Sequence, residues 1–285
     1  MDLGLKDHIV LISGGGSGIG RAITELCLSE GSRVVVAGRR TPEVDAFAKE
    51  MPPRGDGEKR CLFFYAELDD PRQCEAAVAF ARVQFGKLDA LINNAGANDN
   101  VGLATGDPER FQASLRQNLL HYYALAHYAV PLLQETRGSI VNISSKVAVT
   151  GQGGTSAYAA AKGAQLALTR EWAAELLPLG IRVNAVVPAE VLTPLYRRWL
   201  SAQGASLTLA DIEHRIPLSR RMTRPEEIAA TVVFLLSPTQ SGHTTGQQIF
   251  VDGGYTHLDR ALTCGPATEM RQSAEKERAE DDGDR

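Results

Sequence analysis

A tyrosine and a lysine four residues apart, Tyr158 and Lys162, have the types and spacing needed to move a proton. Residues at this spacing share one face of a helix, so the ammonium group can lie near the phenol. A phenol with an ordinary pKa of about 10 is a weak base at neutral pH, but a nearby positive charge favours the phenolate. The pair is therefore a candidate general base, although surface helices commonly contain the same spacing.

A glycine-rich turn near the amino terminus is suited to bind phosphate. The sequence Ser13-Gly-Gly-Gly-Ser-Gly-Ile-Gly20 follows an apolar run and opens a helical pattern. Glycine permits a tight turn and close backbone approach, while the free N–H groups at the start of a helix attract a pyrophosphate. A glycine-rich turn alone is a weak signal, but its place between a strand and a helix favours dinucleotide binding over a flexible loop.

Short apolar runs alternate with longer helical patterns along the chain. Seven runs are typical of strands, at residues 8–13, 33–37, 61–66, 88–93, 139–144, 181–187 and 247–251. Helical patterns lie between them, at residues 18–30, 42–51, 71–85, 108–134, 156–177 and 225–236. This alternation predicts an α/β fold, a single doubly wound Rossmann-type domain with a seven-stranded parallel sheet and helices on both faces.

The expected domain covers residues 1–262 and leaves two unusual segments. Residues 193–216 interrupt the alternation just after a strand end, where α/β proteins bind their ligands, so we expect a lid over the substrate there. Residues 263–285 are rich in charge and poor in large apolar side chains, which predicts a disordered tail.

The composition argues against several other classes of protein. The 285 residues carry a formal net charge of −4 and a pI near 5.9, unlike a nucleic-acid-binding protein. The sequence has no apolar run long enough for a membrane span and no signal peptide, so we expect a cytoplasmic protein that does not bind membranes. Its four cysteines and six histidines are dispersed, so no metal is expected.

The ordered set of motifs resembles the short-chain dehydrogenase/reductase family. Besides the glycine turn and the Tyr158–Lys162 pair, the chain has Asn93-Asn-Ala-Gly96 after the fourth strand, Asn118 in the next helix, and Ser144-Ser145 after the fifth strand. The resemblance covers about residues 5–254 and implies hydride transfer between a nicotinamide cofactor and a secondary or anomeric hydroxyl. It also implies a homotetramer or homodimer, in which residues 255–262 could cross to a neighbouring subunit.

The resemblance assigns the catalytic roles to Asn118, Ser145, Tyr158 and Lys162. Ser145, with Ser144 as the adjacent alternative, would hydrogen-bond the reacting oxygen. Tyr158 would take the hydroxyl proton. Asn118 would hold a backbone distortion and a water that connects Lys162 to solvent.

The end of the second strand bears on the choice of cofactor. An acidic residue there would bind the adenosine ribose of NAD, but the chain has Gly38-Arg39-Arg40. The two arginines could pair with the 2′-phosphate of NADP, so we expect NADP, with NAD possible. If they form only a solvated turn, NAD and NADP should support comparable turnover. The expected cofactor contacts are Ser13, Gly14, Ser17, Gly18, Ile19, Gly20, Arg39, Arg40, Glu67, Asn94, Ala95, Gly96, Tyr158, Lys162, Pro188, Val191 and Thr193.

The segment after the sixth strand bears on the substrate. Glu190 stands at the expected mouth of the site, where a carboxylate could accept hydrogen bonds from neighbouring hydroxyls of a polyol, or could be an exposed loop charge. Residues 145–152, 188–196 and 257–261 resemble the bacterial L-fucose dehydrogenases of the family, which implies oxidation of an aldose to its lactone. The expected substrate contacts are Ser145, Lys146, Gln152, Glu190, Tyr196 and Trp199, with Asn98 and His121 as further candidates.

Two other functions are compatible with the same fold. One is a ketone reductase of the family that acts on a steroid or an acyl-thioester, for which the charged segment Arg197-Arg-Trp-Leu-Ser201 is a poor lid. The other is a nucleotide-binding sensor without catalysis, which would not need the four catalytic side chains.

Overall fold

A seven-stranded parallel sheet forms the centre of the computed structural model, which describes residues 2–51, 59–202 and 208–258. The strands lie in the order β3-β2-β1-β4-β5-β6-β7. Their bounds are β1 Ile9–Ser13, β2 Arg33–Gly38, β3 Cys61–Tyr65, β4 Ala90–Asn93, β5 Ser139–Ile143, β6 Arg182–Pro188 and β7 Gln248–Val251. The predicted fold class is therefore confirmed.

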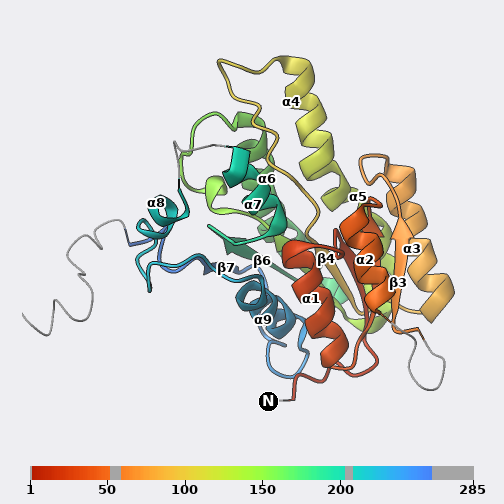
Figure 1. The fold of residues 1–285 in the computed structure, drawn as a ribbon. Helices are drawn as coiled ribbons and strands as arrows, with labels where there is room; N and C mark the ends of the chain where they lie inside the picture. The colour runs from red at the N-terminus through yellow and green to blue at the C-terminus, as the bar shows by residue number, and fades with distance from the viewer. Residues whose placement is uncertain (1, 52–58, 203–207, 259–285) are drawn as a thin grey trace, which may run out of the picture.

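Helices cover both faces of the sheet (Figure 1). The bounds are α1 Gly18–Ser29, α2 Pro42–Glu50, α3 Pro71–Phe85, α4 Pro108–Leu115, α5 His121–Thr136, α6 Ser156–Glu175, α7 Pro194–Ala202, α8 Leu209–Glu213 and α9 Pro225–Leu236. Side chains of α1 and α9 pack on one face of the sheet, and side chains of α3, α5 and α6 pack on the other.

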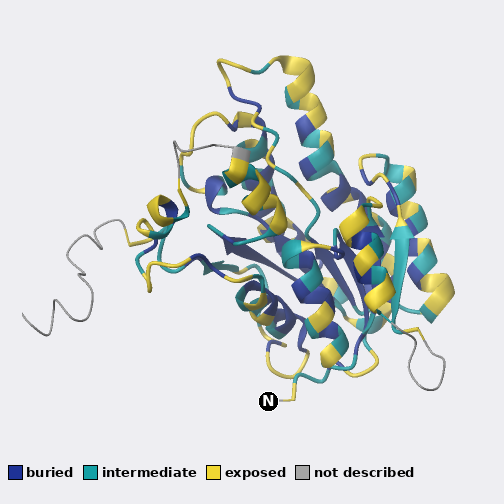
Figure 2. Ribbon diagram, viewed as in Figure 1, coloured by how far each residue is buried: buried dark blue, intermediate teal, exposed yellow. Residues whose placement is uncertain are grey.

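The β2 strand shows why this sequence forms a sheet that is buried on both faces. Val34 and Val36 pack in the cluster that contains α1 and α9, whereas Val35 packs in the cluster on the opposite face. Side chains alternate across a strand, so a continuous run of valines satisfies both layers at once. In Figure 2 the strands are mostly buried, while the exposed residues gather on the outer surfaces of the helices.

Local signals fix where several helices begin. The side chains of Thr41, Asp70 and Asp107 each accept a hydrogen bond from a backbone N–H of the helix that follows. Each is followed by a proline at the first helical position, where the missing N–H costs no hydrogen bond. These helices therefore begin at the residues that the sequence predicts.

The helix expected over residues 108–134 is not continuous. It divides into α4 and α5, joined by a π-helical turn at Arg116–Leu120 that contains Asn118. A π-helical turn adds one residue to a single turn, and a shift of one residue is too small to be recognised in the apolar pattern of one sequence. This widening matters for the site, because it changes which backbone carbonyls of the helix remain free to bond elsewhere.

The segment expected to form a lid contains α7 and α8. Residues 203–207 of it, and the tail expected to be disordered at 263–285, lie outside the described residues. Among the described residues, no helix is long and apolar enough to cross a membrane, and no group of three or more His, Cys, Asp or Glu could hold a metal ion.

Candidate active site and cofactor cleft

Three adjacent cavities lie along the carboxyl ends of the strands. The first, here the β2-side cavity, has a volume of about 200 Å³ and lies at the ends of β2 and β3. The second, the central cavity, has about 340 Å³ and contains the glycine turn, and the third, the lid cavity, has about 630 Å³ and lies beside α7 and α8. Gly96 lines all three. The order of the cavities suits an extended dinucleotide with its phosphates at the glycine turn and a substrate beyond its far end.

Close packing explains two glycines of the turn. Gly14 has a φ of +66°, in the left-handed region that glycine adopts without strain. A Cβ atom on Gly20 would lie 2.1 Å from the Gly14 carbonyl oxygen, so no larger residue fits there. The turn therefore keeps its backbone exposed to the central cavity, which Ser17, Gly18 and Ile19 also line.

Ser13 lies beneath the turn rather than in a cavity wall. Its buried hydroxyl accepts hydrogen bonds from the backbone N–H groups of Asn94 and Ala95, at 2.9 and 3.1 Å. The Asn94 side chain in turn donates to the carbonyls of Ser13 and Gly14, each at 3.1 Å. Of the residues expected to contact the cofactor, Ser13 thus holds the glycine turn against the loop after β4.

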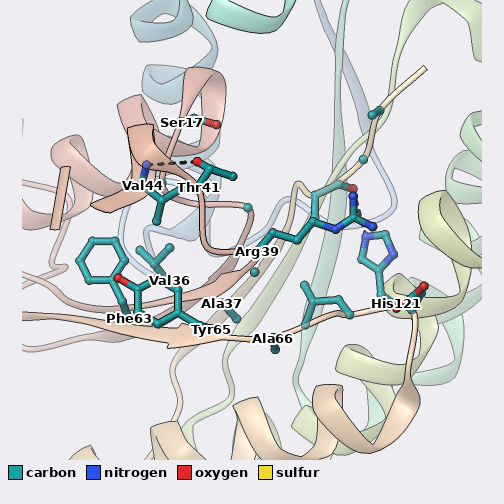
Figure 3. A pocket seen from close by; sticks show the side chains of 18 of the residues that line it. Ser17, Val36, Ala37, Arg39, Thr41, Val44, Phe63, Tyr65, Ala66 and His121 are labelled. Carbon is teal, nitrogen blue, oxygen red and sulfur yellow. Dashed lines mark hydrogen bonds between the residues drawn. The ribbon is translucent and has the colours of Figure 1, made fainter. Parts of the chain in front are cut away.

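The two arginines after β2 have different surroundings. Arg39 lines the β2-side cavity (Figure 3). Its Nε donates to Glu67 Oε2 at 2.7 Å. Arg40 instead donates to Asp45 at 3.0 Å and lies over the Tyr65 ring, with its guanidinium carbon 5.2 Å from the ring centroid. Only Arg39 is therefore placed to meet a group bound in this cavity.

His121 lines the β2-side cavity and not the lid cavity, so its expected place among the substrate contacts is wrong (Figure 3). Its Nε2 lies 3.0 Å from the Ala95 carbonyl oxygen. Burial lowers the pKa of His121 to about 4, so the ring is neutral near pH 7. Five further residues expected to contact the cofactor line the central cavity: Tyr158, Lys162, Pro188, Val191 and Thr193.

Tyr158 and Ser145 face the same two cavities, the central cavity and the lid cavity. Burial raises the pKa of Tyr158 to about 12, against a hydrogen bond with Ser145 that lowers it. The neighbouring Ser144 lines only the central cavity, and its hydroxyl donates to the Lys162 carbonyl oxygen at 2.9 Å. The structure thus separates the two serines, because adjacent residues at a strand end point to opposite sides.

Lys162 is buried and makes three hydrogen bonds through its ammonium group. Nζ donates to the Ile143 carbonyl oxygen at 2.8 Å, to Gln165 Oε1 at 3.1 Å and to the Tyr122 hydroxyl at 3.3 Å. Burial lowers the pKa of Lys162 to about 7, because an ammonium group loses its hydration in the protein interior. Nζ lies 5.5 Å from the Tyr158 ring centroid.

The expected lowering of the Tyr158 pKa depended on Lys162 together with the positive nicotinamide of a cofactor, and Lys162 alone does not bring that pKa below its ordinary value. Burial raises the pKa of Tyr158 and lowers that of Lys162, so both side chains are shifted toward their neutral forms. A further positive charge in the central cavity would be needed to favour the phenolate.

The π-helical turn places Asn118 between the loop after β4 and α6. Its Oδ1 accepts from the Ala97 N–H at 2.8 Å, and its Nδ2 donates to the Ser114 carbonyl oxygen at 3.1 Å. Its main-chain carbonyl accepts from Gln165 Nε2 at 2.7 Å. The backbone distortion expected at Asn118 is therefore present, and the Gln165 amide joins the Asn118 carbonyl to Lys162. The water expected to connect Lys162 to solvent stays a prediction.

The expected substrate contacts line the lid cavity together, and three of them are bonded to one another. The Glu190 carboxylate forms an ion pair with Lys146 through Oε1, and its Oε2 accepts from the Tyr196 hydroxyl at 2.6 Å. The Glu190 side chain is only 12% exposed, so it is not a solvated loop charge. The contacts among Lys146, Glu190 and Tyr196 therefore link the loops after β5 and β6 to the lid helix α7.

Sequence reasoning missed Tyr255, Ile212 and Arg215 in the wall of this cavity. Lys146 Nζ lies 3.9 Å from the Tyr255 ring centroid, a cation–π contact within one chain. Tyr255 was expected to lie in a segment that crosses to another subunit, and of that segment residues 259–262 lie outside the described residues.

Comparison with known proteins supports the same conclusion as the motifs and the cavities. A family model described as "Enoyl-(Acyl carrier protein) reductase" matches residues 14–256. The chain is 34% identical to a 3-oxoacyl-[acyl-carrier-protein] reductase of Thermotoga maritima, over 88% of this chain and 98% of that protein. It is 32% identical to an L-fucose dehydrogenase of Bos taurus, over 86% of this chain and 88% of that protein.

Solved structures show the same similarity in three dimensions. A structure described as Cj0485 dehydrogenase aligns with a TM-score of 0.85 and 43% identity, over 92% of this chain and 99% of that one. An aldohexose dehydrogenase of Thermoplasma acidophilum aligns with a TM-score of 0.79 and 30% identity, over 90% and 96% of the two chains. The chain therefore belongs to the short-chain dehydrogenase/reductase family, whose members are NAD(P)-dependent oxidoreductases.

Proposed function

We propose that this enzyme oxidises the anomeric hydroxyl of an aldose, such as L-fucose, to the lactone. The observation that carries the proposal is the Lys146–Glu190–Tyr196 cluster, which lies in the same cavity as Ser145 and Tyr158. Each oxygen of the Glu190 carboxylate has two acceptor sites and uses one in this cluster, so it can accept a hydroxyl of a bound ring. A cluster of charged and hydroxyl groups on one side of a cavity suits a ligand with several hydroxyls.

The lid cavity also offers aromatic surface beside this cluster. Tyr196 and Trp199 of α7 pack edge to face with ring centroids 5.2 Å apart, and both line the cavity. Aromatic rings next to polar groups match a sugar, which has an apolar ring face and a polar rim. The names of two relatives, the L-fucose and aldohexose dehydrogenases, agree with this substrate class.

The two alternatives fit the cavity less well. A steroid or acyl-thioester substrate would have to displace or desolvate a buried ion pair, which is costly without a charged partner. A sensor without catalysis would have no use for Ser145, Tyr158 and Lys162 gathered at one cavity. Because one relative is named a 3-oxoacyl-[acyl-carrier-protein] reductase, the substrate test below includes a ketone and an acyl-thioester.

Four side chains of the protein would each have a separate role in the proposed reaction. A bound nicotinamide cofactor supplies the hydride acceptor and, when oxidised, a positive charge in the central cavity. Ser145 holds the reacting oxygen, and Tyr158 takes the hydroxyl proton once its phenolate is favoured. Lys162 stabilises that phenolate, and Asn118 fixes the loop at Gly96 on which both cavities depend.

NADP is the cofactor that the β2-side cavity favours within this proposal. Arg39 lines the cavity and Gly38 carries no carboxylate, so the end of β2 offers a cation to a 2′-phosphate. Arg39 would have to exchange or share its bond with Glu67, whose side chain is 63% exposed. An exposed ion pair of this kind is weak, so the exchange costs little.

The location and the assembly follow the family resemblance in this proposal. We place the enzyme in the cytoplasm as a homotetramer or a homodimer that acts on a small molecule. A monomer in light scattering would contradict this assembly.

Replacing Tyr158 with Phe should lower turnover by about a hundredfold or more, because general acid–base catalysis by one side chain contributes that much. Cofactor binding, followed by protein fluorescence, should stay close to that of the wild-type enzyme. Tyr123→Phe is the matched control, because Tyr123 is 53% exposed on α5. A Tyr158→Phe enzyme with near wild-type turnover would show that Tyr158 is not the base.

A panel of L-fucose, D-arabinose and L-galactose, each with NAD and NADP, should give nicotinamide absorbance for one stereochemical set. For the active sugar, Glu190→Gln should raise KM about tenfold, because the variant loses a charged hydrogen-bond acceptor. Glu226→Gln, on the exposed surface of α9, is the control. No turnover of any of the sugars, together with turnover of a ketone or an acyl-thioester, would overturn the aldose assignment.

Replacing Arg39 with Ala should weaken NADP binding about tenfold while NAD binding changes little, because only NADP carries the 2′-phosphate. Arg40→Ala is the control, since Arg40 is held by Asp45 and Tyr65 away from the cavity. Fluorescence titration with both cofactors measures the effect. Equal losses for NAD and NADP, or no loss for either, would contradict the NADP preference.

A further inference from the structure

Gln165 is a fully buried polar side chain one turn after Lys162 on α6. Both ends of its amide are occupied. Oε1 accepts from Lys162 Nζ at 3.1 Å, and Nε2 donates to the Asn118 carbonyl oxygen at 2.7 Å. A single side chain therefore spans the distance between the ammonium group and the π-helical turn, without an intermediary.

The partners of the amide fix its orientation. Turned by half a rotation, the NH₂ group would face the ammonium group, and Oε1 would face the carbonyl oxygen, so both contacts would be repulsive. In the observed orientation the amide oxygen faces the positive charge, which stabilises the charged form of Lys162. The amide thus acts against the burial that favours the neutral amine.

Neutral groups surround Lys162 in the described part of the chain. Its three hydrogen-bond acceptors are the Ile143 carbonyl on β5, the Tyr122 hydroxyl on α5 and the Gln165 amide. The titratable groups that face it are Tyr158 on α6 and Tyr122 and His121 on α5. No carboxylate among the described residues forms an ion pair with it, so each neutral acceptor has a large share in holding the charge.

We propose that Gln165 is a positioning residue for catalysis, which keeps Lys162 charged and aligned by tying its ammonium group to the Asn118 carbonyl. The proposal rests on the hydride chemistry of the proposed function but not on the choice of sugar. In this proposal the function of the π-helical turn is to present the Asn118 carbonyl to the Gln165 amide.

Two substitutions of Gln165 distinguish this role from simple packing. Gln165→Met keeps the length of the side chain but removes both hydrogen bonds, so the pKa of Lys162 should fall by about one unit. Gln165→Glu places a carboxylate against the ammonium group, so the same pKa should rise. A packing role would not shift the pKa in opposite directions.

The pKa of Lys162 is measured by NMR on protein labelled with ¹³C at the lysine ε-carbons, and Lys162→Arg identifies the signal. The pH profile of kcat/KM, taken with whichever substrate the wild-type enzyme turns over, should move about one unit toward alkaline pH in Gln165→Met. The reason is that Tyr158 then has less positive charge beside it.

Thr169→Val is the control for damage to the buried face of α6. Thr169 donates to the Gln165 main-chain carbonyl at 2.7 Å and accepts from Asn142 Nδ2 at 3.0 Å, with no contact to Lys162. This variant should lose thermal stability and keep the wild-type pKa of Lys162.

An unchanged pKa of Lys162 in Gln165→Met, or shifts of the same sign in both Gln165 variants, would overturn the proposal. A wild-type enzyme that is silent on every substrate would count against the proposed function, while the NMR titration would still decide the role of Gln165.

Discussion

The site depends on burying one ammonium group, that of Lys162, where the sheet ends. Removing such a group from water costs several kcal/mol, and in the described residues no carboxylate pairs with it to offset that cost. The protein offsets it with three neutral oxygens from three elements: the Ile143 carbonyl of β5, the Tyr122 hydroxyl of α5 and the Gln165 amide of α6. The positions of these elements are thereby coupled to the position of one charge.

Burial opposes the charged forms of both Tyr158 and Lys162. The pKa of Tyr158 is raised to about 12 and that of Lys162 is lowered to about 7, so the phenol is neutral near pH 7 while the amine is divided between its charged and neutral forms. A positive charge that arrives with the oxidised cofactor would favour the phenolate, and the base would then form only in a loaded site. In the lid cavity the Glu190 carboxylate is paired within the protein, with Lys146 and the Tyr196 hydroxyl.

Much of the fold and of the site could be predicted because it follows short-range rules. Runs such as Val34–Val36 can only be buried strands in this pattern, and the spacing of Tyr158 and Lys162 fixes a shared helical face. A backbone distortion at Asn118 was expected from the family resemblance alone, because the spacing of apolar residues did not show that the helix contains a π-helical turn there. The Gln165–Asn118 bond, the Tyr255–Lys146 contact and the pairing of Glu190 with Lys146 join segments that are distant in the sequence, so the spacing of residues does not reveal them.

The central claim is that the ionisation of Tyr158 waits for the oxidised cofactor. It is tested most directly by the ultraviolet difference titration of the wild-type enzyme against Tyr158→Phe, with and without NADP. We expect Tyr158 to titrate at about pH 12 in the free protein and below its ordinary pKa of about 10 in the complex. Titration at the same pH in both states would contradict the account.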